Sequence, residues 1–330
     1  MIDVLVLGDL NPDLVLRGDL VPRFGQAEQL LDAATLVLGG SAAITAHAFA
    51  RLGRPTRLGA LIGDDTFGDI VVGLLTAQGV DTRAVIKDPE RPTGLTVVLS
   101  QGQERAVLTF PGTIAALSVD HAMAALEDAA ADGARHLHVS SLFLQPSLGG
   151  GLAAVFERAH TLGLSTSLDP NFDPAQRWDG VEGLLPHLDV FLPNRSETLA
   201  IAGRIAGRSF DDVAAAGLLL ASRGPVVVIT DGRNGALQVS PDGSQFRDAG
   251  KPVEAVDTTG AGDTFAAAYL DSLLRGLSAA ECLRRAVLAG ALSTSAIGGT
   301  AGQPRLDQLV QVTVDHRILT TEDADAARQQ

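Results

Sequence analysis

The chain of 330 residues is poor in cysteine, lysine, aromatic residues and positive charge. Its one cysteine, Cys282, excludes an intrachain disulfide and favours a reducing, cytoplasmic setting. Its only lysines, Lys87 and Lys251, stand outside any Gly-x-x-x-x-Gly-Lys-Ser/Thr loop, which excludes the P-loop class of nucleotide-binding enzymes. The net charge of −14 argues against binding to nucleic acid or to an anionic membrane, because both need a basic surface.

Long apolar runs are also missing. No stretch is long enough to cross a bilayer, and Met1 to Asp9 has neither a basic segment nor an apolar run of signal-peptide length. With 46% hydrophobic residues, the chain can bury the core of one large α/β domain. We therefore expect a soluble protein in which 1–320 form a single domain and 321–330 a polar tail.

Short β-rich apolar runs alternate with helical patterns along the chain. The runs lie at 4–7, 136–140, 165–168, 190–192 and 226–229, with helical patterns such as 152–162 and 213–220 between them. This alternation predicts a doubly wound αβα sandwich with a mostly parallel central sheet, whose ligands bind at the carboxyl ends of the strands. Two segments, about 12–38 and 80–112, interrupt the alternation and are typical of short strands and turns.

The segment from Asp257 to Asp263 reads Asp-Thr-Thr-Gly-Ala-Gly-Asp and leads into a helical pattern. Because Gly260 and Gly262 lack Cβ atoms, the N–H groups of Gly260, Ala261 and Gly262 can converge on an anion at the positive end of a helix dipole. A carboxylate repels phosphate, so Asp263 makes chemical sense as the base that takes the proton of an attacking alcohol. The segment predicts a kinase. Alternatively, both aspartates are ordinary turn and helix-start acids.

Four segments, taken in this order, resemble signatures of the PfkB (ribokinase-like) carbohydrate kinases. They are Gly39-Gly40-Ser41 with a small-residue helix ending at Arg51-Leu52-Gly53, Asn194-Arg195-Ser196-Glu197, Thr230-Asp231-Gly232-Arg233-Asn234-Gly235, and the 257–263 run. The resemblance extends from Gly8 to about Gly302. It implies a ribokinase-like fold, ATP-dependent phosphorylation of a sugar hydroxyl, magnesium as cofactor, and a β-sheet lid made by 12–38 and 80–112 that two subunits of a homodimer can share.

The resemblance also implies an acceptor site at the carboxyl ends of the strands. Its candidate residues are Asn11, Asp13, Gly39, Gly40, Ser41 and Asn171. Their chemistry suits hydroxyl groups, although Asn11 also fits an Asx turn and Ser41 a helix N-cap. The chain departs from the family at two positions, where Ile44 replaces an Asn and Asp173 an Arg, with Arg177 as a substitute for the latter. An apolar Ile44 leaves the identity of the sugar open.

A second implied group would hold the nucleotide and its metal ions. The ATP-binding candidates are Asn194, Thr230, Gly232, Gly235 and Thr258, the magnesium candidates Asn194 and Glu197, and the candidates for a monovalent cation such as potassium Asp257 and Thr259. Oxygen ligands suit magnesium, which keeps several waters and shares the phosphates. The Asn194–Glu197 spacing fits a helix capping box equally well, and 230–235 also fits the turn of a hairpin.

Two other functions compete with a sugar kinase. A nucleoside kinase of the same fold would stack a base on aromatic rings, and the aromatic content is 4%, with Phe24, Phe110 and Phe143 as candidates. A non-catalytic sugar or nucleotide sensor is expected to lose the base, whereas Asp263 is present. A phosphosugar substrate would need a cationic clamp, for which Arg105 is the candidate. The sequence favours a neutral sugar.

Overall fold

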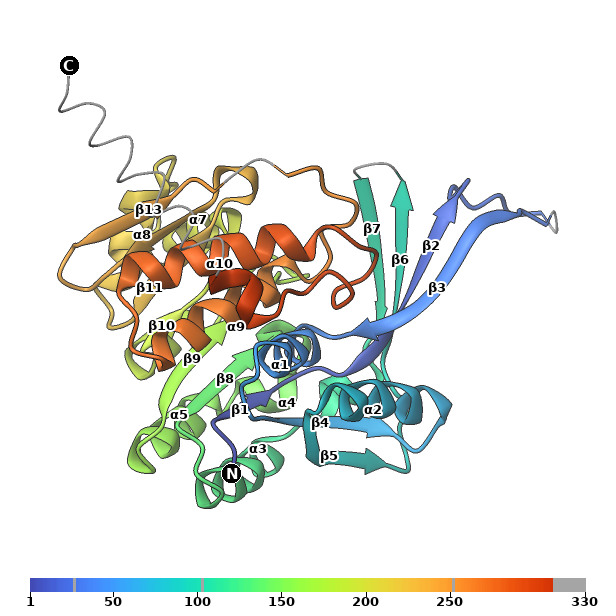
Figure 1. Cartoon of the computed structure of the whole chain (residues 1–330), viewed down its shortest axis with the longest axis horizontal. Helices are drawn as coiled ribbons and strands as arrows, with labels where there is room; N and C mark the ends of the chain where they lie inside the picture. The colour runs from blue at the N-terminus through green and yellow to red at the C-terminus, as the bar shows by residue number, and fades with distance from the viewer. Residues whose placement is uncertain (26–27, 102–103, 251–252, 311–330) are drawn as a thin grey trace.

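A computed structural model describes residues 1–25, 28–101, 104–250 and 253–310. In this part of the chain, nine strands form the central sheet in the order β13-β12-β11-β10-β9-β8-β1-β4-β5 (Figure 1). Their bounds are β1 Val4–Leu7, β4 Thr56–Gly63, β5 Asp81–Asp88, β8 His136–Ser140, β9 Ser165–Asp169, β10 Val190–Phe191, β11 Val226–Thr230, β12 Ala236–Val239 and β13 Gln245–Asp248. Neighbouring strands are parallel except in the β11–β12 and β12–β13 pairs. The predicted mostly parallel sheet is confirmed.

Helices cover both faces of this sheet. One face packs against α1 (Ser41–Arg51), α2 (Thr66–Gln78), α9 (Ala261–Leu274) and α10 (Ala279–Ser293). The other packs against α3 (Val119–Ala131), α4 (Pro146–Gly149), α5 (Leu152–Thr161), α6 (Val181–Leu184), α7 (Arg195–Ala206) and α8 (Val213–Ala221). Strand β1 is wholly buried because its side chains alternate between the two cores, with Leu5 in one and Val6 in the other. No helix of the described residues is long and apolar enough to span a membrane.

A second sheet of four strands projects from the body as a lid (Figure 1). Its order is β3-β2-β6-β7, with bounds β2 Asn11–Gly18, β3 Leu31–Gly39, β6 Leu95–Gln101 and β7 Glu104–Phe110. The expected lid segment 80–112 begins too early, because β5 pairs with β4 at the edge of the central sheet. A half-exposed edge strand carries polar residues much as a lid strand does. The expected tail, 321–330, lies outside the described residues.

Two histidines lie buried on β8. His136 is hydrogen-bonded to Ser165 Oγ and Ser167 Oγ, each at 2.7 Å, and His138 to Ser167 Oγ at 2.8 Å and Ser140 Oγ at 2.9 Å. Every ring nitrogen therefore has a hydroxyl partner inside the sheet. Burial lowers the pKa of His136 to about 4 and that of His138 to about 3, so both rings are neutral at physiological pH.

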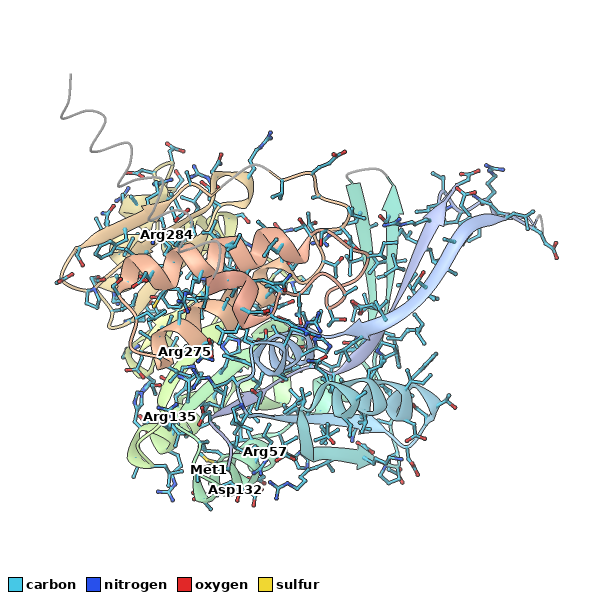
Figure 2. All side chains as sticks on the ribbon, viewed as in Figure 1. Met1, Arg57, Asp132, Arg135, Arg275 and Arg284 are labelled. Carbon is cyan, nitrogen blue, oxygen red and sulfur yellow. The ribbon has the colours of Figure 1, made fainter. Side chains whose placement is uncertain are left out.

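The amino-terminal edge of the sheet holds a cluster of paired charges around one buried arginine. Arg57, near Asp132 and Met1 in Figure 2, is fully buried and pairs with Asp81 at 2.8 Å, Asp128 at 2.6 Å and Asp132. Its guanidinium donors therefore find acceptors within the protein. Other buried acids lie at the opposite, carboxyl edge, where the strands open into two cavities.

Candidate active site

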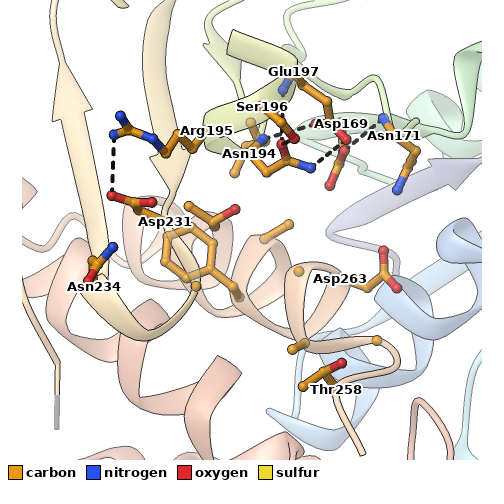
Figure 3. A pocket seen from close by; sticks show the side chains of 18 of the residues that line it. Asp169, Asn171, Asn194, Arg195, Ser196, Glu197, Asp231, Asn234, Thr258 and Asp263 are labelled. Atoms are coloured by element: carbon orange, nitrogen blue, oxygen red, sulfur yellow. Dashed lines mark hydrogen bonds and ion pairs between the residues drawn. The ribbon is translucent and has the colours of Figure 1, made fainter. Parts of the chain in front are cut away.

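Two adjoining cavities, of about 720 Å³ and 540 Å³, lie at the carboxyl ends of the strands. They share walls formed by Thr230, Gly232, Thr258 and Gly262. In the larger one, Asp263 and Thr258 lie on one side, and Asp169, Asn194 and Glu197 on the other (Figure 3). This is the edge at which a doubly wound sheet binds its ligands.

Asp263 occupies the first turn of α9 and lines the larger cavity. The carboxylate is buried and accepts a hydrogen bond from Ser41 Oγ, a residue of α1 that lies 222 positions away in the chain. Burial raises the pKa of Asp263 to about 7, helped by the negative charges of Asp9 and Asp13 and opposed by the Ser41 hydrogen bond. A carboxylate with such a pKa is suited to accept a proton near neutral pH.

The amino terminus of α9 presents main-chain donors to both cavities. Gly260 is the N-cap residue in the left-handed conformation, with φ of 71°, and no described side chain caps the helix. The Ala261 N–H donates to Thr258 O at 3.3 Å, so one of the three expected amides is engaged within the loop. A Cβ at Gly262 would meet no atom within 4 Å, because that residue borders open space. The uncapped first turn is a ready anion site.

Tight packing behind the loop explains both Gly260 and Ile44. A Cβ on Gly260 would lie 2.6 Å from Gly299 Cα and 3.0 Å from Ile44 Cγ2. Ile44 is itself buried, with its Cδ1 2.5 Å from the place of a Cβ on Gly299. Ile44 therefore packs between the anion loop and the 298–299 turn.

Asp257 fixes the start of the anion loop. Its Oδ1 accepts from Thr259 N at 2.9 Å and Thr259 Oγ1 at 2.7 Å, and its Oδ2 accepts from Gly298 N at 2.9 Å. Despite partial burial, these bonds hold the pKa of Asp257 below its usual range. The lid reaches the same place, since Arg105 Nη1 donates to Thr259 Oγ1 at 3.0 Å.

The expected acceptor residues gather where β1 runs into the lid. Asn11 Nδ2 donates to Asp13 Oδ1 at 2.9 Å and to Thr96 Oγ1 at 3.2 Å. A Cβ on Gly39 would lie 1.9 Å from Asp13 Oδ1, so glycine is required for the carboxylate to sit there. Burial, and then the charge of Asp9, raise the pKa of Asp13 to about 7. This group meets the cavity through the Ser41–Asp263 contact and does not line it directly.

Asp9 is a site residue that the sequence analysis did not single out. Its carboxylate accepts from Ser41 N at 3.0 Å and Ala42 N at 2.9 Å and so caps α1. Gly40, with φ of 85°, passes so close to the Asp9 carbonyl oxygen that a Cβ would lie 2.6 Å from it. Asp9 thus takes the capping role expected of Ser41, whose hydroxyl is free to face Asp263. Its place in the sequence, an acid two residues after the buried strand β1, could have identified it.

The segment after β9 contributes Asp169 and Asn171. Asn171 has φ of 52°, and its Oδ1 accepts from Ser141 N at 2.7 Å. Asp173 does not face the cavity, because its carboxylate accepts from the N–H groups of 175, 177 and 178 at 2.7 to 2.8 Å. Arg177 does not replace the missing arginine, since it is exposed and pairs with Asp179 at 3.0 Å.

Asn194 and Glu197 form the capping box of α7. Asn194 Oδ1 accepts from Glu197 N at 2.9 Å, and Glu197 accepts from Asn194 N at 2.9 Å and from Asn194 Nδ2 at 2.6 Å. The capping box that the spacing allowed is therefore present, and the buried Glu197 carboxylate still lies in the cavity wall. Burial raises the pKa of Glu197, and burial with the charges of Glu197 and Asp263 raises the pKa of Asp169 well above its usual range. Such a cluster favours a cation.

The 230–235 segment is both a hairpin turn and a cavity wall. β11 and β12 pair as antiparallel strands, as one alternative predicted. Thr230 and Gly232 line both cavities, and Gly235 lines the smaller one. A Cβ on Gly235 would lie 1.9 Å from Asp248 O, so the turn needs glycine. Other walls of the smaller cavity are small or aliphatic residues, which carry no motif in the sequence: Ala249, Gly250, Val253, Ala255, Val287, Gly290 and Ala291.

The sequence profile of the pfkB family of carbohydrate kinases matches residues 1–306. The chain belongs to this family. Members of the family are phosphotransferases whose acceptor is an alcohol group, and this chain is one of them.

Similar sequences include several sugar kinases. A ribokinase of Schizosaccharomyces pombe is 29% identical over 93% of this chain and 96% of its own, and a deoxyribokinase of Salmonella typhimurium is 26% identical over 93% and 97%. An ATP-dependent ribose-1-phosphate kinase of Halopiger xanaduensis is 29% identical over 93% and 96%. These relatives support a sugar kinase of this family without fixing the sugar.

Similar solved structures share the fold. Arabidopsis thaliana ribokinase complexed with ribose and ATP has a TM-score of 0.78 at 23% identity, over 94% of this chain and 98% of its own. An E. coli protein assigned as a ribokinase II, in complex with ATP and Mg²⁺, has a TM-score of 0.81 at 24% identity, over 96% and 100%. The ribokinase-like fold with a separate lid sheet is thereby confirmed.

Proposed function

We propose that this protein transfers the γ-phosphoryl group of ATP to a hydroxyl group of a sugar. The observation that carries the proposal is Asp263, a buried carboxylate with a pKa of about 7 beside the uncapped amino terminus of α9 in the 720 Å³ cavity. The acceptor oxygen would form a bond to the γ-phosphorus as the bond to the bridging oxygen breaks, and its proton would pass to Asp263. The amides of Gly260 and Gly262 would stabilise the transferring group.

The nucleotide would occupy both cavities. The smaller one, lined by Val253, Val287, Phe265 and several small residues, suits a flat apolar base. The phosphates would then extend past Thr258 and Gly262, which border both cavities, toward Asp263. Thr230, Gly232 and Gly235 would line the ribose side of this path. The γ-phosphate would thus reach the Asp263 carboxylate from the smaller cavity.

Magnesium fits the acid cluster of the larger cavity. Glu197 and Asp169 would hold it, because both are buried carboxylates in the wall of this cavity, and a cation would offset the burial that raises their pKa values. Asn194 would act through Glu197, since its side-chain oxygen caps α7. When bound with ATP, the ion supplies charge neutralisation to the phosphates.

Potassium does not fit the residues implied for it. Both oxygens of Asp257 accept hydrogen bonds from within the protein, and Thr259 Oγ1 accepts from the positively charged Arg105. A cation at these two residues would lie beside the Arg105 guanidinium, whose positive charge would oppose its binding. We therefore assign no step to a monovalent cation.

The acceptor would be a neutral sugar held by Asp13, with Asn11 orienting the carboxylate and Asn171 contributing from the segment that follows β9. A nucleoside acceptor is less well supported, because the rings proposed for it lie elsewhere. Phe24 and Phe110 are exposed, and Phe143 packs edge-on against Trp178 with ring centroids 5.5 Å apart. None of these three lines either cavity.

A homodimer through the lid is supported by the apolar outer face of that sheet. Leu36, Leu108 and Phe110 are 38%, 58% and 53% exposed there. Such a patch is costly to leave in water and fits a second copy of the same surface. Sedimentation equilibrium of wild type and of Leu108→Glu tests this. We expect a dimer and a monomer, respectively, and a monomeric wild type would contradict the assignment.

The enzyme assignment is tested by following ADP release over panels of free sugars, nucleosides and sugar phosphates. We expect turnover with a free sugar, lowered in Asp263→Asn by a factor on the order of 10² to 10⁴, the range for loss of a general base. ATP binding, measured by calorimetry, should persist and serves as the check of folding. ATP binding without ADP release on any acceptor would instead identify a sensor.

A further inference from the structure

The inner face of the lid is ordered in three rows of side chains. The register places Asp13, Thr96 and Thr109 opposite one another, then Val15, Val98 and Val107, then Arg17, Ser100 and Arg105. Residues opposite one another in neighbouring strands point to the same face. The first row is polar and touches Asn11 through Thr96. The last row therefore puts two arginines on the face that carries Asp13.

Arg105 is the arginine that reaches the anion loop. Its Nη1 donates to Thr259 Oγ1 at 3.0 Å, and Thr259 Oγ1 donates in turn to Asp257 Oδ1 at 2.7 Å. Arg105 also lines the larger cavity together with Gly260 and Asp263, whereas Arg17 lines neither of the two cavities. A contact across 154 positions thus joins the lid to the loop in front of α9.

The charge of Arg105 is not cancelled by a carboxylate. Among the ion pairs of the described residues, none includes Arg105, whereas Arg195 on the same cavity lies 3.6 Å from Asp231. The positive charge of the guanidinium instead acts at longer range on Asp13, Asp257 and Asp263, where it opposes the effect of burial on each pKa. A guanidinium with one neutral partner keeps donors free for a phosphoryl group, which it binds in bidentate fashion.

We propose that Arg105 binds the transferring phosphoryl group and so completes, from the lid, the anion site that the α9 amides begin. This proposal rests on the proposed function. The alternative, a clamp for a second anionic group on the acceptor, is less well supported, because the contact of Arg105 is with the anion loop. The guanidinium would stabilise the charge that develops as the bond to the bridging oxygen breaks, and its position makes that stabilisation depend on a closed lid.

The kinetic test compares Arg105→Met and Arg105→Lys with Arg17→Met, a matched control from the same row of the lid. We expect Arg105→Met to lower kcat by about 100-fold or more, toward the range for arginines supplied to a transferring phosphoryl group, with acceptor KM changed by less than about threefold. Arg105→Lys should recover only part of kcat, because an ammonium cannot bind in bidentate fashion. Arg17→Met should match wild type.

Chemical rescue separates a direct role from a structural one. Free guanidinium at low millimolar concentration should raise the kcat of Arg105→Ala and leave wild type unaffected, because the small cation can fill the vacated place. Arg105→Met with wild-type kcat would overturn the proposal. A loss confined to the KM of a phosphorylated acceptor would also overturn it, in favour of the acceptor clamp.

A binding measurement keeps the proposal testable without any acceptor. ADP with aluminium fluoride imitates the transferring phosphoryl group, and calorimetry gives its affinity beside that of ADP alone. We expect Arg105→Met to bind ADP normally and ADP with aluminium fluoride at least about tenfold more weakly than wild type. Equal affinities for the two proteins would refute the role of Arg105. If no sugar is phosphorylated, the proposed function fails while this comparison still decides the inference.

Discussion

Replacing Ser41 with Ala should move the pH profile of the reaction toward higher pH. Ser41 Oγ donates to the Asp263 carboxylate and is one of the contacts that hold down a pKa raised to about 7 by burial. A hydrogen bond to a charged group contributes about 1.5 to 3 kcal/mol, and about 1.4 kcal/mol corresponds to one pKa unit. The variant should therefore titrate about one to two units above wild type.

The direction of the pH dependence follows from the role of Asp263 as a base. Only the ionised carboxylate accepts a proton, so kcat/KM for the acceptor should rise with pH through about 7 and level off above it. At about pH 6 the wild type should retain roughly a tenth of its plateau value, and Ser41→Ala roughly a hundredth or less.

Direct measurement of phosphorylated product from radiolabelled ATP avoids coupling enzymes that have pH profiles of their own. Ser272→Ala, a buried serine farther along α9, is the matched control and should keep the wild-type profile. A profile without an acidic limb near neutrality, or a shift of the Ser41→Ala limb toward lower pH, would refute the assignment of Asp263.

Three further changes test other parts of the structure. Gly39→Ala should raise acceptor KM and spare ATP affinity in calorimetry, because the new Cβ would displace the Asp13 carboxylate 1.9 Å away. Acidification from about pH 6.5 to 4 should lower the melting temperature. In the unfolded chain His136 and His138 take up protons over this range, whereas in the folded protein, with pKa values of about 4 and 3, they stay largely neutral. A variant with glutamine at both positions should lose much of this pH dependence. Glu197→Gln should raise the magnesium concentration needed for half-maximal turnover, and an unchanged requirement would remove Glu197 from the metal site.

The fold was predictable where local pattern and burial coincide. The runs that became β1, β8, β9, β10 and β11 are short and apolar because they lie in a sheet covered on both sides. β4 gave no such signal, since it contains Gly59 in a run of mixed residues. A Cβ at Gly59 would lie 2.6 Å from Leu7 Cδ2, so the glycine serves packing between neighbouring strands. The need for glycine at this position depends on the pairing of β4 with β1, which the sequence of β4 alone does not reveal.

In the candidate site, too, local features could be predicted and long-range contacts could not. Gly260 and Asp263 follow one another closely, and their roles follow from backbone geometry at a helix start. Ile44 could be recognised as unable to bond a sugar, but its packing behind Gly260 depends on a segment more than 200 positions away. The contact between Arg105 and Thr259 is likewise tertiary, spanning 154 positions. Sequence patterns report local geometry and leave such long-range contacts open.

β2 begins with Asn11 and includes Asp13, so the strand that would hold the acceptor is also a strand of the lid. An acceptor bound to Asp13 would therefore hold this strand, and with it the lid, in place. Water bound at Asp13 would not hold the strand in this way, so β2 would couple the chemistry at the nucleotide to the presence of the acceptor. Hydrolysis of ATP without a sugar would then be slow.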